Sequence, residues 1–330
     1  MIRVALDVMG GDNAPNSNLD GAVKALKEND KIFVRLFGPE KVIKQYLEGK
    51  DVDESRYEII DAPEVIETGE PPVQAISKKK NSSMYLGLKS LSEGTSDAFV
   101  SAGSTGALLV GGQTVAGRVK GVKRSPLAIV VPTLKGQSVI VDCGANVDAR
   151  PEMLVQFAVM GSLYSKHILG VENPTVGLIN IGTEEEKGNE LTRSTYPLLK
   201  ECADINFIGN AEARDVALGA ADVLVCEAFT GNVVLKMYEG VSKALLKQIK
   251  AALKSTVLGS IGGLMIKPSL KGLMKTFDSS EDGGAPMLGL NGLVVKAHGN
   301  STDVQIKNAI IQCIAFKEND LGGKIQDAIR

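Results

Sequence analysis

Residues 180–191, Asn-Ile-Gly-Thr-Glu-Glu-Glu-Lys-Gly-Asn-Glu-Leu, follow an apolar run and contain residue types that bind anions. Lys187 is the only cation within the loop, and Asn180 and Asn189 supply neutral amide donors. A loop that joins a buried strand to a helix is a common anion site in α/β proteins. The three glutamates at 184–186 either begin a helix, where carboxylates meet the positive end of its dipole, or project into solvent. The pattern predicts a loop in which Lys187 stabilises negative charge.

Six further segments combine glycine with Asn, Ser, Thr or Asp. They are residues 7–15, 101–107, 142–148, 208–215, 229–233 and 296–300. Glycine lets the backbone turn sharply and bring N–H groups near a ligand, and short polar side chains add donors. Any one such loop is an ordinary connector. Seven of them together predict a broad polar cleft.

Several familiar catalytic patterns are absent from the sequence. No segment fits the dinucleotide motif G-x-G-x-x-G, the phosphate loop G-x-x-x-x-G-K-[ST] or the nucleophile elbow G-x-S-x-G. The four cysteines are far apart and histidine occurs only at positions 167 and 298, so no zinc site or disulfide framework is indicated. We expect no metal and no organic cofactor.

Length and charge exclude further classes. A chain of 330 residues fits one large catalytic domain, 1–330, possibly with two lobes. Lys and Arg number 37 against 39 Asp and Glu, so the chain has no overall field that would attract nucleic acid. The chain opens on an apolar run without a secretory signal, and glycines interrupt the other apolar stretches. These features predict a reduced, cytoplasmic protein without a membrane span.

Short runs rich in Val, Ile and Leu alternate with longer helical patterns along most of the chain. The expected strands are residues 2–8, 31–37, 57–61, 97–101, 138–142, 174–181, 205–209, 222–226 and 292–297. The expected helices include residues 18–28, 82–93, 151–167, 190–201, 232–254 and 302–317. This alternation predicts an α/β fold with a doubly wound, mostly parallel, Rossmann-like sheet. Ligands of such sheets lie beyond the C-terminal ends of the strands, where the polar loops are expected.

Eight segments match one protein family in order and in spacing. They are DVMGGDNAP (7–15), KKKNSSM (78–84), SAGSTGALL (101–109), GANVDARPEMLVQFAVMGS (144–162), NIGTEEEKGNEL (180–191), FIGNAEARD (207–215), FTGNVVLK (229–236) and VVKAHG (294–299). These segments resemble the bacterial phosphate acyltransferases of phospholipid synthesis, from residue 2 to residue 320. The resemblance implies transfer of a fatty acyl group from acyl-acyl-carrier protein to inorganic phosphate, which gives acyl phosphate. It also implies a fold similar to the isocitrate dehydrogenase and phosphotransacetylase type.

The resemblance implies roles for individual loop residues. Phosphate is partly a dianion at neutral pH, so the reaction needs positioning and charge stabilisation more than a strong base. The residues implied to stabilise the phosphate or the developing oxyanion during catalysis are Lys187, Asn180, Asn189 and Asn232. Residues implied to bind phosphate or the thioester are Ser101, Gly103, Ser104, Thr105, Gly106, Lys80, Ser82, Asn210, Thr230 and His298. Residues implied to shape the loops are Asp7, Gly10, Gly11, Asp12, Asp142 and Asn146.

Some positions depart from the family pattern. Ser104 stands where asparagine is usual, Glu227 and Ala228 stand where Asp-Gly is common, and Asn13 stands where histidine is frequent. Ser104 keeps a hydrogen-bond donor and Glu227 keeps a carboxylate. The activity is therefore still expected, while the role of each position is open.

Residues 240–280 are expected to form a helical hairpin unlike the rest of the chain. Pro268 suits a helix start, after which apolar residues share one face and lysines recur on another. The residues implied to make contacts are Lys267, Lys271, Leu273, Lys275 and Phe277. This segment either packs against the second subunit of a homodimer, lies on an anionic membrane or receives the acidic carrier protein. Membrane contact would suit an enzyme whose product passes to a membrane glycerol-3-phosphate acyltransferase.

Two other functions are compatible with the sequence. An NAD-dependent decarboxylating dehydrogenase of similar fold would need a nicotinamide pocket and usually a metal held by carboxylates. Asp7, Asp12, Asp142 and Asp148 are candidate ligands, but their loops lack a clustered ligand motif. The other alternative is a non-catalytic scaffold that binds carrier protein or lipid.

Overall fold

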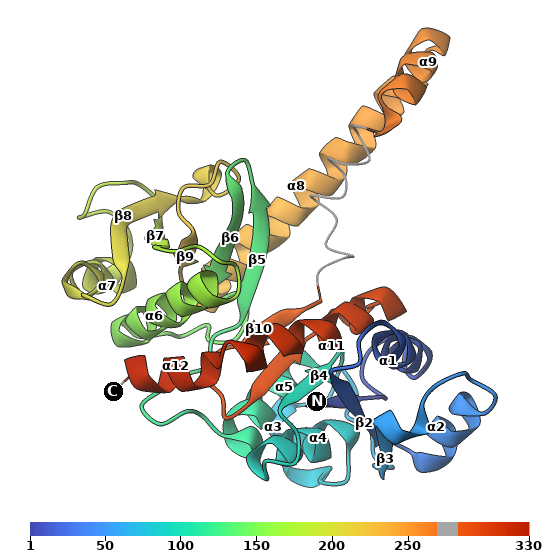
Figure 1. Cartoon of the computed structure of the whole chain (residues 1–330). Coiled ribbons are helices and arrows are strands. Elements are labelled where there is room, and N and C mark those ends of the chain that lie inside the picture. The colour runs from blue at the N-terminus through green and yellow to red at the C-terminus, as the bar shows by residue number, and fades with distance from the viewer. Residues whose placement is uncertain (269–282, 330) are drawn as a thin grey trace.

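The strands form two separate sheets. The computed structural model describes residues 1–268 and 283–329 (Figure 1). The first sheet has six strands in the order β10 (Ala285–Met287), β11 (Leu293–Lys296), β4 (Ala98–Ser101), β1 (Ile2–Asp7), β2 (Ile32–Gly38) and β3 (Tyr57–Asp61). All its neighbouring strands are parallel except β10 and β11.

The second sheet has five strands. Their order is β5 (Ala128–Thr133), β6 (Gly136–Val141), β9 (Val223–Val225), β7 (Thr175–Asn180) and β8 (Asn206–Glu212). The hairpin β5–β6 is antiparallel and the other pairs are parallel. The expected α/β fold with mostly parallel strands is confirmed. We expected one sheet, but the structure has two. The polar loops therefore lie along the edges of two sheets.

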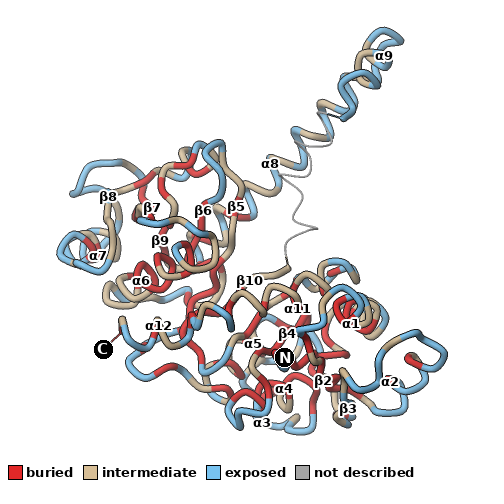
Figure 2. The backbone as a smooth tube through the Cα atoms, viewed as in Figure 1, coloured by how far each residue is buried: buried red, intermediate tan, exposed pale blue. Residues whose placement is uncertain are grey.

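Helices cover both faces of the first sheet because its strands alternate their side chains between the faces. The helices of this lobe are α1 (Asn16–Glu28), α2 (Glu40–Leu47), α3 (Pro72–Lys78), α4 (Ser83–Ser92), α5 (Thr105–Gly111) and α11 (Asp303–Glu318). On one face, Leu6 and Val34 pack against α1 and α11. On the other, Phe37 and Phe99 pack against α3, α4 and α5. Figure 2 shows the resulting buried strands beneath exposed helix surfaces.

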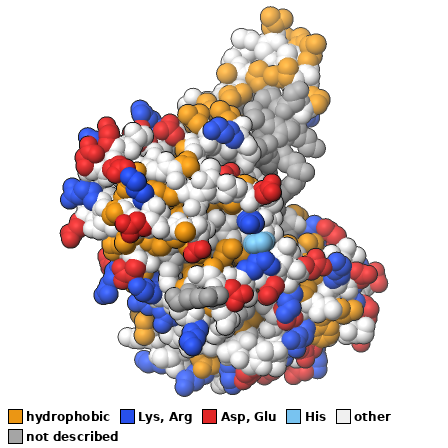
Figure 3. Space-filling view, turned by 60° about the vertical axis from the view of Figure 1, so that its left-hand side comes forward, with side chains coloured by type: hydrophobic (Ala, Val, Ile, Leu, Met, Phe, Trp, Pro, Cys, Tyr) orange, Lys and Arg blue, Asp and Glu red, His pale blue; other side chains and the backbone are white. Residues whose placement is uncertain are grey.

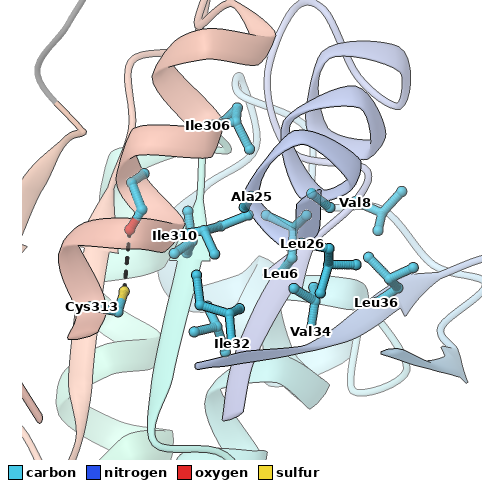
Figure 4. Close-up of a cluster of buried hydrophobic side chains, with 14 of the residues drawn as sticks. Leu6, Val8, Ala25, Leu26, Ile32, Val34, Leu36, Ile306, Ile310 and Cys313 are labelled. Carbon is cyan, nitrogen blue, oxygen red and sulfur yellow. Dashed lines mark hydrogen bonds between the residues drawn. The ribbon is translucent and has the colours of Figure 1, made fainter. Parts of the chain in front are cut away.

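The contact between α1, α11 and the first sheet is dry and apolar. Figure 4 shows Leu6, Val34 and Ile310 pointing toward one another between strand and helix. The Cys313 thiol lies in the same layer and donates to the Ala309 carbonyl oxygen at 3.2 Å. Burial of side chains of this size contributes about 1.5–3 kcal/mol each, which holds α11 against β1.

The second sheet is also covered on both faces. Its helices are α6 (Pro151–His167), α7 (Glu190–Glu201), α12 (Leu321–Ala328) and the start of α8 (Ala228–Lys254). Val139 and Phe157 belong to the core beneath α6, and Leu224 and Leu235 belong to the core beneath α8. Phe316 of α11 packs on Tyr164 of α6 with ring centroids 5.6 Å apart, so α11 joins the cores of the two lobes.

Several element boundaries agree with the sequence and others do not. The bounds of α6 and α7 match the expected helices, because Pro151 suits a first helical position and Asn189 caps α7. Helix α8 begins at Ala228 rather than 232. The elements missed by the strand and helix patterns are α2, α3, α5, β5, β10 and α12.

Helices α8 and α9 (Val257–Met265) form an arm that projects from the second lobe (Figure 1). The arm occupies part of the predicted hairpin 240–280. Lys267 is exposed just beyond α9. The other predicted contact residues, Lys271, Leu273, Lys275 and Phe277, lie outside the described residues.

Candidate functional site

Two strands of the first sheet, β1 and β4, end in polar residues that contact each other. The Asp7 carboxylate, at the end of β1, is 1% exposed and accepts hydrogen bonds from Ser101 Oγ at 2.7 Å and Ser83 Oγ at 2.6 Å. Burial raises the pKa of Asp7, and the two serine hydroxyls act against that shift. Ser101 Oγ also accepts from the Gly103 amide at 3.0 Å. The hydroxyl of Ser101 therefore fixes the loop and is already bonded to Asp7.

Glycine is required where these loops touch. A Cβ at Gly10 would lie 2.7 Å from the Gly103 nitrogen, and one at Gly11 would lie 2.8 Å from the Gly299 oxygen. Gly11 also has a φ of 96°, which other residues rarely adopt. The amide of Asp12 donates to the Gly299 carbonyl at 2.7 Å. The loops after β1, β4 and β11 thus pack backbone to backbone, as the sequence predicted for Gly10, Gly11 and Asp12 as shaping residues.

Lys296 is a half-buried cation at this meeting point. Its Nζ donates to the Ala102 carbonyl at 3.4 Å and to the Ala297 carbonyl. Desolvation lowers the pKa of Lys296 to about 8, and the nearby Asp7 and Asp12 carboxylates act in the opposite direction. Residues 296–300 form one of the predicted polar loops, but Lys296 was not among the predicted site residues. The available signal was a lysine that ends an apolar strand immediately before Ala-His-Gly.

His298 follows Lys296 on the same loop. The side chain is exposed and its carbonyl accepts from the Ser301 amide at 3.1 Å. The imidazole has no hydrogen-bond partner among the described residues. It is therefore available to a ligand at this edge.

The turn after β4 carries the residues predicted as a phosphate cradle. Ser104 caps α5 and accepts from the Ala107 amide at 3.4 Å. Thr105 begins α5, is exposed and has no side-chain hydrogen bond within the described ranges. Gly106 is close to the Pro72 ring, so a larger residue would displace α3. Of these side chains, Thr105 is the one most open to a ligand.

Lys80 and Ser82, which were predicted to bind the phosphate or the thioester, do not form one site. Ser82 is fully buried, donates to the Lys79 carbonyl at 2.7 Å and accepts from the Tyr85 amide as the cap of α4. This bonding contradicts the prediction that Ser82 donates to a ligand, because its hydroxyl hydrogen is already used. Lys80 is exposed and has no ion-pair partner in the part of the chain that the structure describes.

The loop after β7 folds back on itself through two asparagines. Asn180 Nδ2 donates to the Lys187 carbonyl at 3.0 Å, and Asn210 Nδ2 donates to the Glu184 carbonyl at 2.7 Å. Gly188 has a φ of 101°, and a side chain there would overlap Asn180 and Thr192. These amides were predicted to be free for substrate. The structure shows instead that they hold the loop, with one amide hydrogen of each already used.

Lys187 projects from this loop without a partner. Its aliphatic stem lies over Gly182, and its ammonium is exposed and unpaired among the described residues. Glu185 turns away and pairs with Lys200 at 2.7 Å. Helix α7 begins only at Glu190, so the prediction that the glutamates begin a helix is wrong and the solvent-facing alternative holds. Lys187 remains a candidate because nothing in the described chain neutralises it.

Helix caps use two more of the predicted donors. The Asn189 Oδ1 accepts from the Thr192 amide at 2.9 Å and caps α7. The Glu227 carboxylate caps α8 and accepts from the amide and hydroxyl of Thr230. The Thr230 hydroxyl is thus already committed to Glu227, in contrast to its predicted substrate role. Asn232 is half-buried and has no side-chain partner among the described residues, so it stays available.

Asp142 is a fully buried acceptor that shapes the loop after β6. It accepts from the amides of Leu127, Gly144, Ala145 and Asn146 and from Asn146 Nδ2. Burial raises the pKa of Asp142 and these donors oppose the shift. The predicted structural role of Asp142 and Asn146 agrees with this bonding. A methyl group at Gly231 would overlap the Asp142 carbonyl, so α8 starts directly on this loop.

The predicted site residues fall into two groups, one on each sheet. The first-sheet group contains Asp7, Ser101, Thr105 and His298, together with Lys296, which was not among the predicted residues. The second-sheet group contains Lys187, Asn180, Asn210 and Asn232. Between described residues we find no hydrogen bond or ion pair that joins the two groups. Within the same ranges, no three His, Cys, Asp or Glu side chains gather as metal ligands.

Comparisons with known proteins agree with the resemblance seen in the sequence. A family model described as fatty acid synthesis protein matches residues 2–322. A phosphate acyltransferase of Clostridium perfringens is 50% identical over 328 residues, which cover 99% of this chain and 97% of that protein. A phosphate acyltransferase of Brevibacillus brevis is 47% identical over 330 residues, which cover 100% of this chain and 98% of that protein.

Two solved structures share the fold at low sequence identity. A phosphotransacetylase from Streptococcus pyogenes has a TM-score of 0.63 and 16% identity and covers 96% of this chain and 94% of its own. A branched-chain phosphotransacylase from Enterococcus faecalis has a TM-score of 0.57 and 12% identity, with coverage of 96% and 99%. These likenesses confirm the expected phosphotransacetylase-type fold.

Proposed function

The chain belongs to the phosphate acyltransferase family of fatty acid and phospholipid synthesis, and from this premise we propose where and how it transfers the acyl group. The proposed acyl donor is the thioester of acyl-acyl-carrier protein, and the acceptor is inorganic phosphate. One observation carries the placement of phosphate: the half-buried Lys296 ammonium lies where the loops after β1, β4 and β11 meet. Phosphate is proposed to bind beside it, within reach of Thr105 and His298.

In the proposed reaction, a phosphate oxygen attacks the thioester carbon. A C–O bond forms, the C–S bond breaks, and the carrier leaves as a thiolate that takes up a proton. Phosphate has a pKa close to neutrality, so the attacking dianion needs no strong base. The protein contributes by holding the phosphate about 3 Å from the thioester carbon and by neutralising charge. Lys187 and Asn232 are proposed to receive the thioester oxygen, since their donors are unpaired among the described residues.

The direct test is an assay with the purified full chain, acylated carrier protein and phosphate. We expect acyl phosphate, measured by phosphorus NMR, to form in equal amount to the free carrier thiol. Hydrolysis of the thioester without acyl phosphate would contradict the assigned acceptor. Absence of turnover with every acyl length would favour a non-catalytic scaffold.

Thr105→Val should raise the KM for phosphate about tenfold or more. The hydroxyl is exposed at the start of α5, and a hydrogen bond to a charged group contributes about 1.5–3 kcal/mol. Steady-state kinetics with phosphate as the varied substrate measures the effect. Thr105→Ser is the matched control, because it keeps the hydroxyl and should stay near the wild-type KM. An unchanged phosphate KM in the folded valine variant would place the cradle elsewhere.

A second copy of the chain is proposed to cover α8. Five exposed apolar residues recur at every fourth position of this helix: Phe229, Val233, Met237, Val241 and Leu245. A row of residues four apart is the ridge that packs into a facing helix in the commonest class of helix contact. An apolar row of this length in water favours a partner with the same surface, as in a homodimer.

The tip of the arm is proposed to lie on an anionic membrane. Val257, Leu258 and Met265 of α9 are 81%, 82% and 78% exposed, and Lys254 and Lys267 flank them. Figure 3 shows hydrophobic side chains gathered on this end of the arm. No helix of the described chain is long and apolar enough to span a bilayer. We therefore propose a cytoplasmic enzyme that contacts the membrane peripherally and passes acyl phosphate to a membrane glycerol-3-phosphate acyltransferase.

Paired variants separate these two surfaces. Leu258→Glu with Met265→Glu should weaken binding to anionic vesicles about 10²-fold, because each apolar side chain contributes roughly 1–2 kcal/mol on burial. Dimerisation and synthesis of acyl phosphate should be retained. Val241→Glu should instead dissociate the dimer. Vesicle flotation and sedimentation velocity measure the two properties, and equal flotation of the tip variant and the wild type would argue against the membrane role.

A further inference from the structure

An open hollow lined by charged side chains lies beside the second sheet and is not used in the proposed reaction. Its volume is about 580 Å³. The cations around it are Arg118, Lys123, Arg124 and Arg150, and the acids are Asp148 and Glu152. We call these six residues the arginine hollow. Cations outnumber acids here by two to one, whereas the chain as a whole has a net charge of −2.

The three guanidinium groups of the arginine hollow form no ion pair among the described residues, although Glu152 acts on Arg150 at longer range. Arg118 donates to the Lys123 carbonyl, and Arg124 donates to the Gln113 side-chain oxygen at 3.2 Å. Neither acceptor carries a charge. Within the described ranges, none of the three arginines has a carboxylate within ion-pair distance, whereas Lys123 pairs with Glu152 at 3.5 Å. Guanidinium groups left in this state are suited to carboxylates, which they bind in a bidentate geometry.

The two walls of the arginine hollow are joined. One wall is the loop 117–124 and the other is the start of α6. The Gln156 side chain of α6 accepts from the Lys123 amide at 2.8 Å and donates to the Gly121 carbonyl at 2.9 Å. The cationic loop is therefore held against α6 before any ligand arrives, which lowers the entropy cost of binding.

The position of the arginine hollow relates it to the reaction. Arg150 lies at the end of the loop that begins with Asp142, directly after β6, and this loop supports the first turn of α8. The other wall leads into β5, whose first residue Ala128 pairs with Val141 at the end of β6. Both walls thus approach the C-terminal edge of the second sheet, the edge that also carries Lys187 and Asn232.

We propose that the arginine hollow docks the acidic surface of the acyl carrier protein, so that its acylated arm reaches the sheet edges while its folded body stays outside. This inference rests on the proposed acyl donor. Arg118, Arg124 and Arg150 are exposed. Exposed charges at the rim of a protein interface attract and orient an oppositely charged partner. A small polyanion is less well suited, because sites for small ligands bury most of the ligand surface.

The test compares a carrier-bound donor with a small neutral one. Arg150→Glu and Arg124→Glu should each raise the KM for acylated carrier protein at least tenfold at low salt. Turnover of the same acyl group on N-acetylcysteamine should stay within twofold of wild type, because this thioester has no acidic surface. Lys41→Glu is the matched control: it makes the same change of charge on exposed α2 and should leave both substrates unaffected.

Each other outcome has a distinct meaning. Equal KM values for acylated carrier in Arg150→Glu, Arg124→Glu and wild type would overturn the docking proposal, as would equal damage to both donors. Another outcome is that ATP or tripolyphosphate binds in an Arg150-dependent way while the KM for acylated carrier stays unchanged. That result would identify a small polyanion as the ligand and would also overturn the docking proposal. Absence of turnover by the wild type would contradict the proposed function instead. Fluorescence anisotropy of labelled carrier with the same variants then tests docking without catalysis.

Discussion

We expect Lys296→Met to lower kcat/KM for acyl phosphate formation by about 10²- to 10³-fold. This is the size of effect expected when a preorganised charged donor is removed from a partly desolvated site. Lys296 is the half-buried cation of the first-sheet group, and its Nζ donates to two backbone carbonyls, which leaves one N–H for phosphate. The measurement is steady-state kinetics on variants whose circular dichroism and thermal unfolding match wild type.

The pH dependence provides a control that a purely structural lysine would not satisfy. The pKa of Lys296 is lowered to about 8, so the ammonium is present below that pH and is lost as the pH rises through it. Wild-type activity should therefore decline above about pH 8. Lys296→Arg keeps its charge in this range and should remove the alkaline decline even if its rate is lower. A folded Lys296→Met variant with wild-type activity and the same alkaline decline would refute the assignment.

We expect Lys187→Ala to lower kcat/KM by about 10²-fold with little change in stability. Lys187 is exposed, has no partner among the described residues and makes its contacts through its aliphatic stem over Gly182, so folding loses little when it is removed. The rate loss is expected because its charge is proposed to meet the developing oxyanion.

A matched variant tests whether the position of Lys187 matters. Lys135 is an exposed lysine in the turn between β5 and β6, at the opposite end of the same sheet, and Lys135→Ala should have near wild-type kinetics. Equal kcat/KM in Lys187→Ala, Lys135→Ala and wild type would remove Lys187 from the mechanism. A raised KM for phosphate with an unchanged kcat would indicate that Lys187 binds the phosphate rather than the oxyanion.

The functional residues also show the limit of reading donors from a sequence. Asn180, Asn210, Ser82 and Thr230 are chemically able to bind an anion, and each lies in a loop of the expected kind. In the structure their donors serve nearby backbone or a helix cap. Local sequence does not reveal this use, because buried or strained loops must satisfy their own polar groups before a ligand can.

The sequence by itself determined the family, the α/β class and the bounds of its most regular helices. Local signals suffice for these features: the helical repeat marks α6 and α7, Pro151 starts one and Asn189 caps the other. The sequence also predicted sharp turns in the glycine-rich loops, and the structure shows Gly10 and Gly11 in close contact with neighbouring chain.

Only the tertiary structure decided which strands share a sheet and which polar residues meet. A continuous apolar run indicates that a strand is buried, but strand pairing depends on contacts between distant segments, such as β11 beside β4. For the same reason the sequence could not identify Lys296. Its burial and its lowered pKa arise from loops that begin at residues 7, 101 and 296, and these loops meet only when the first sheet has formed.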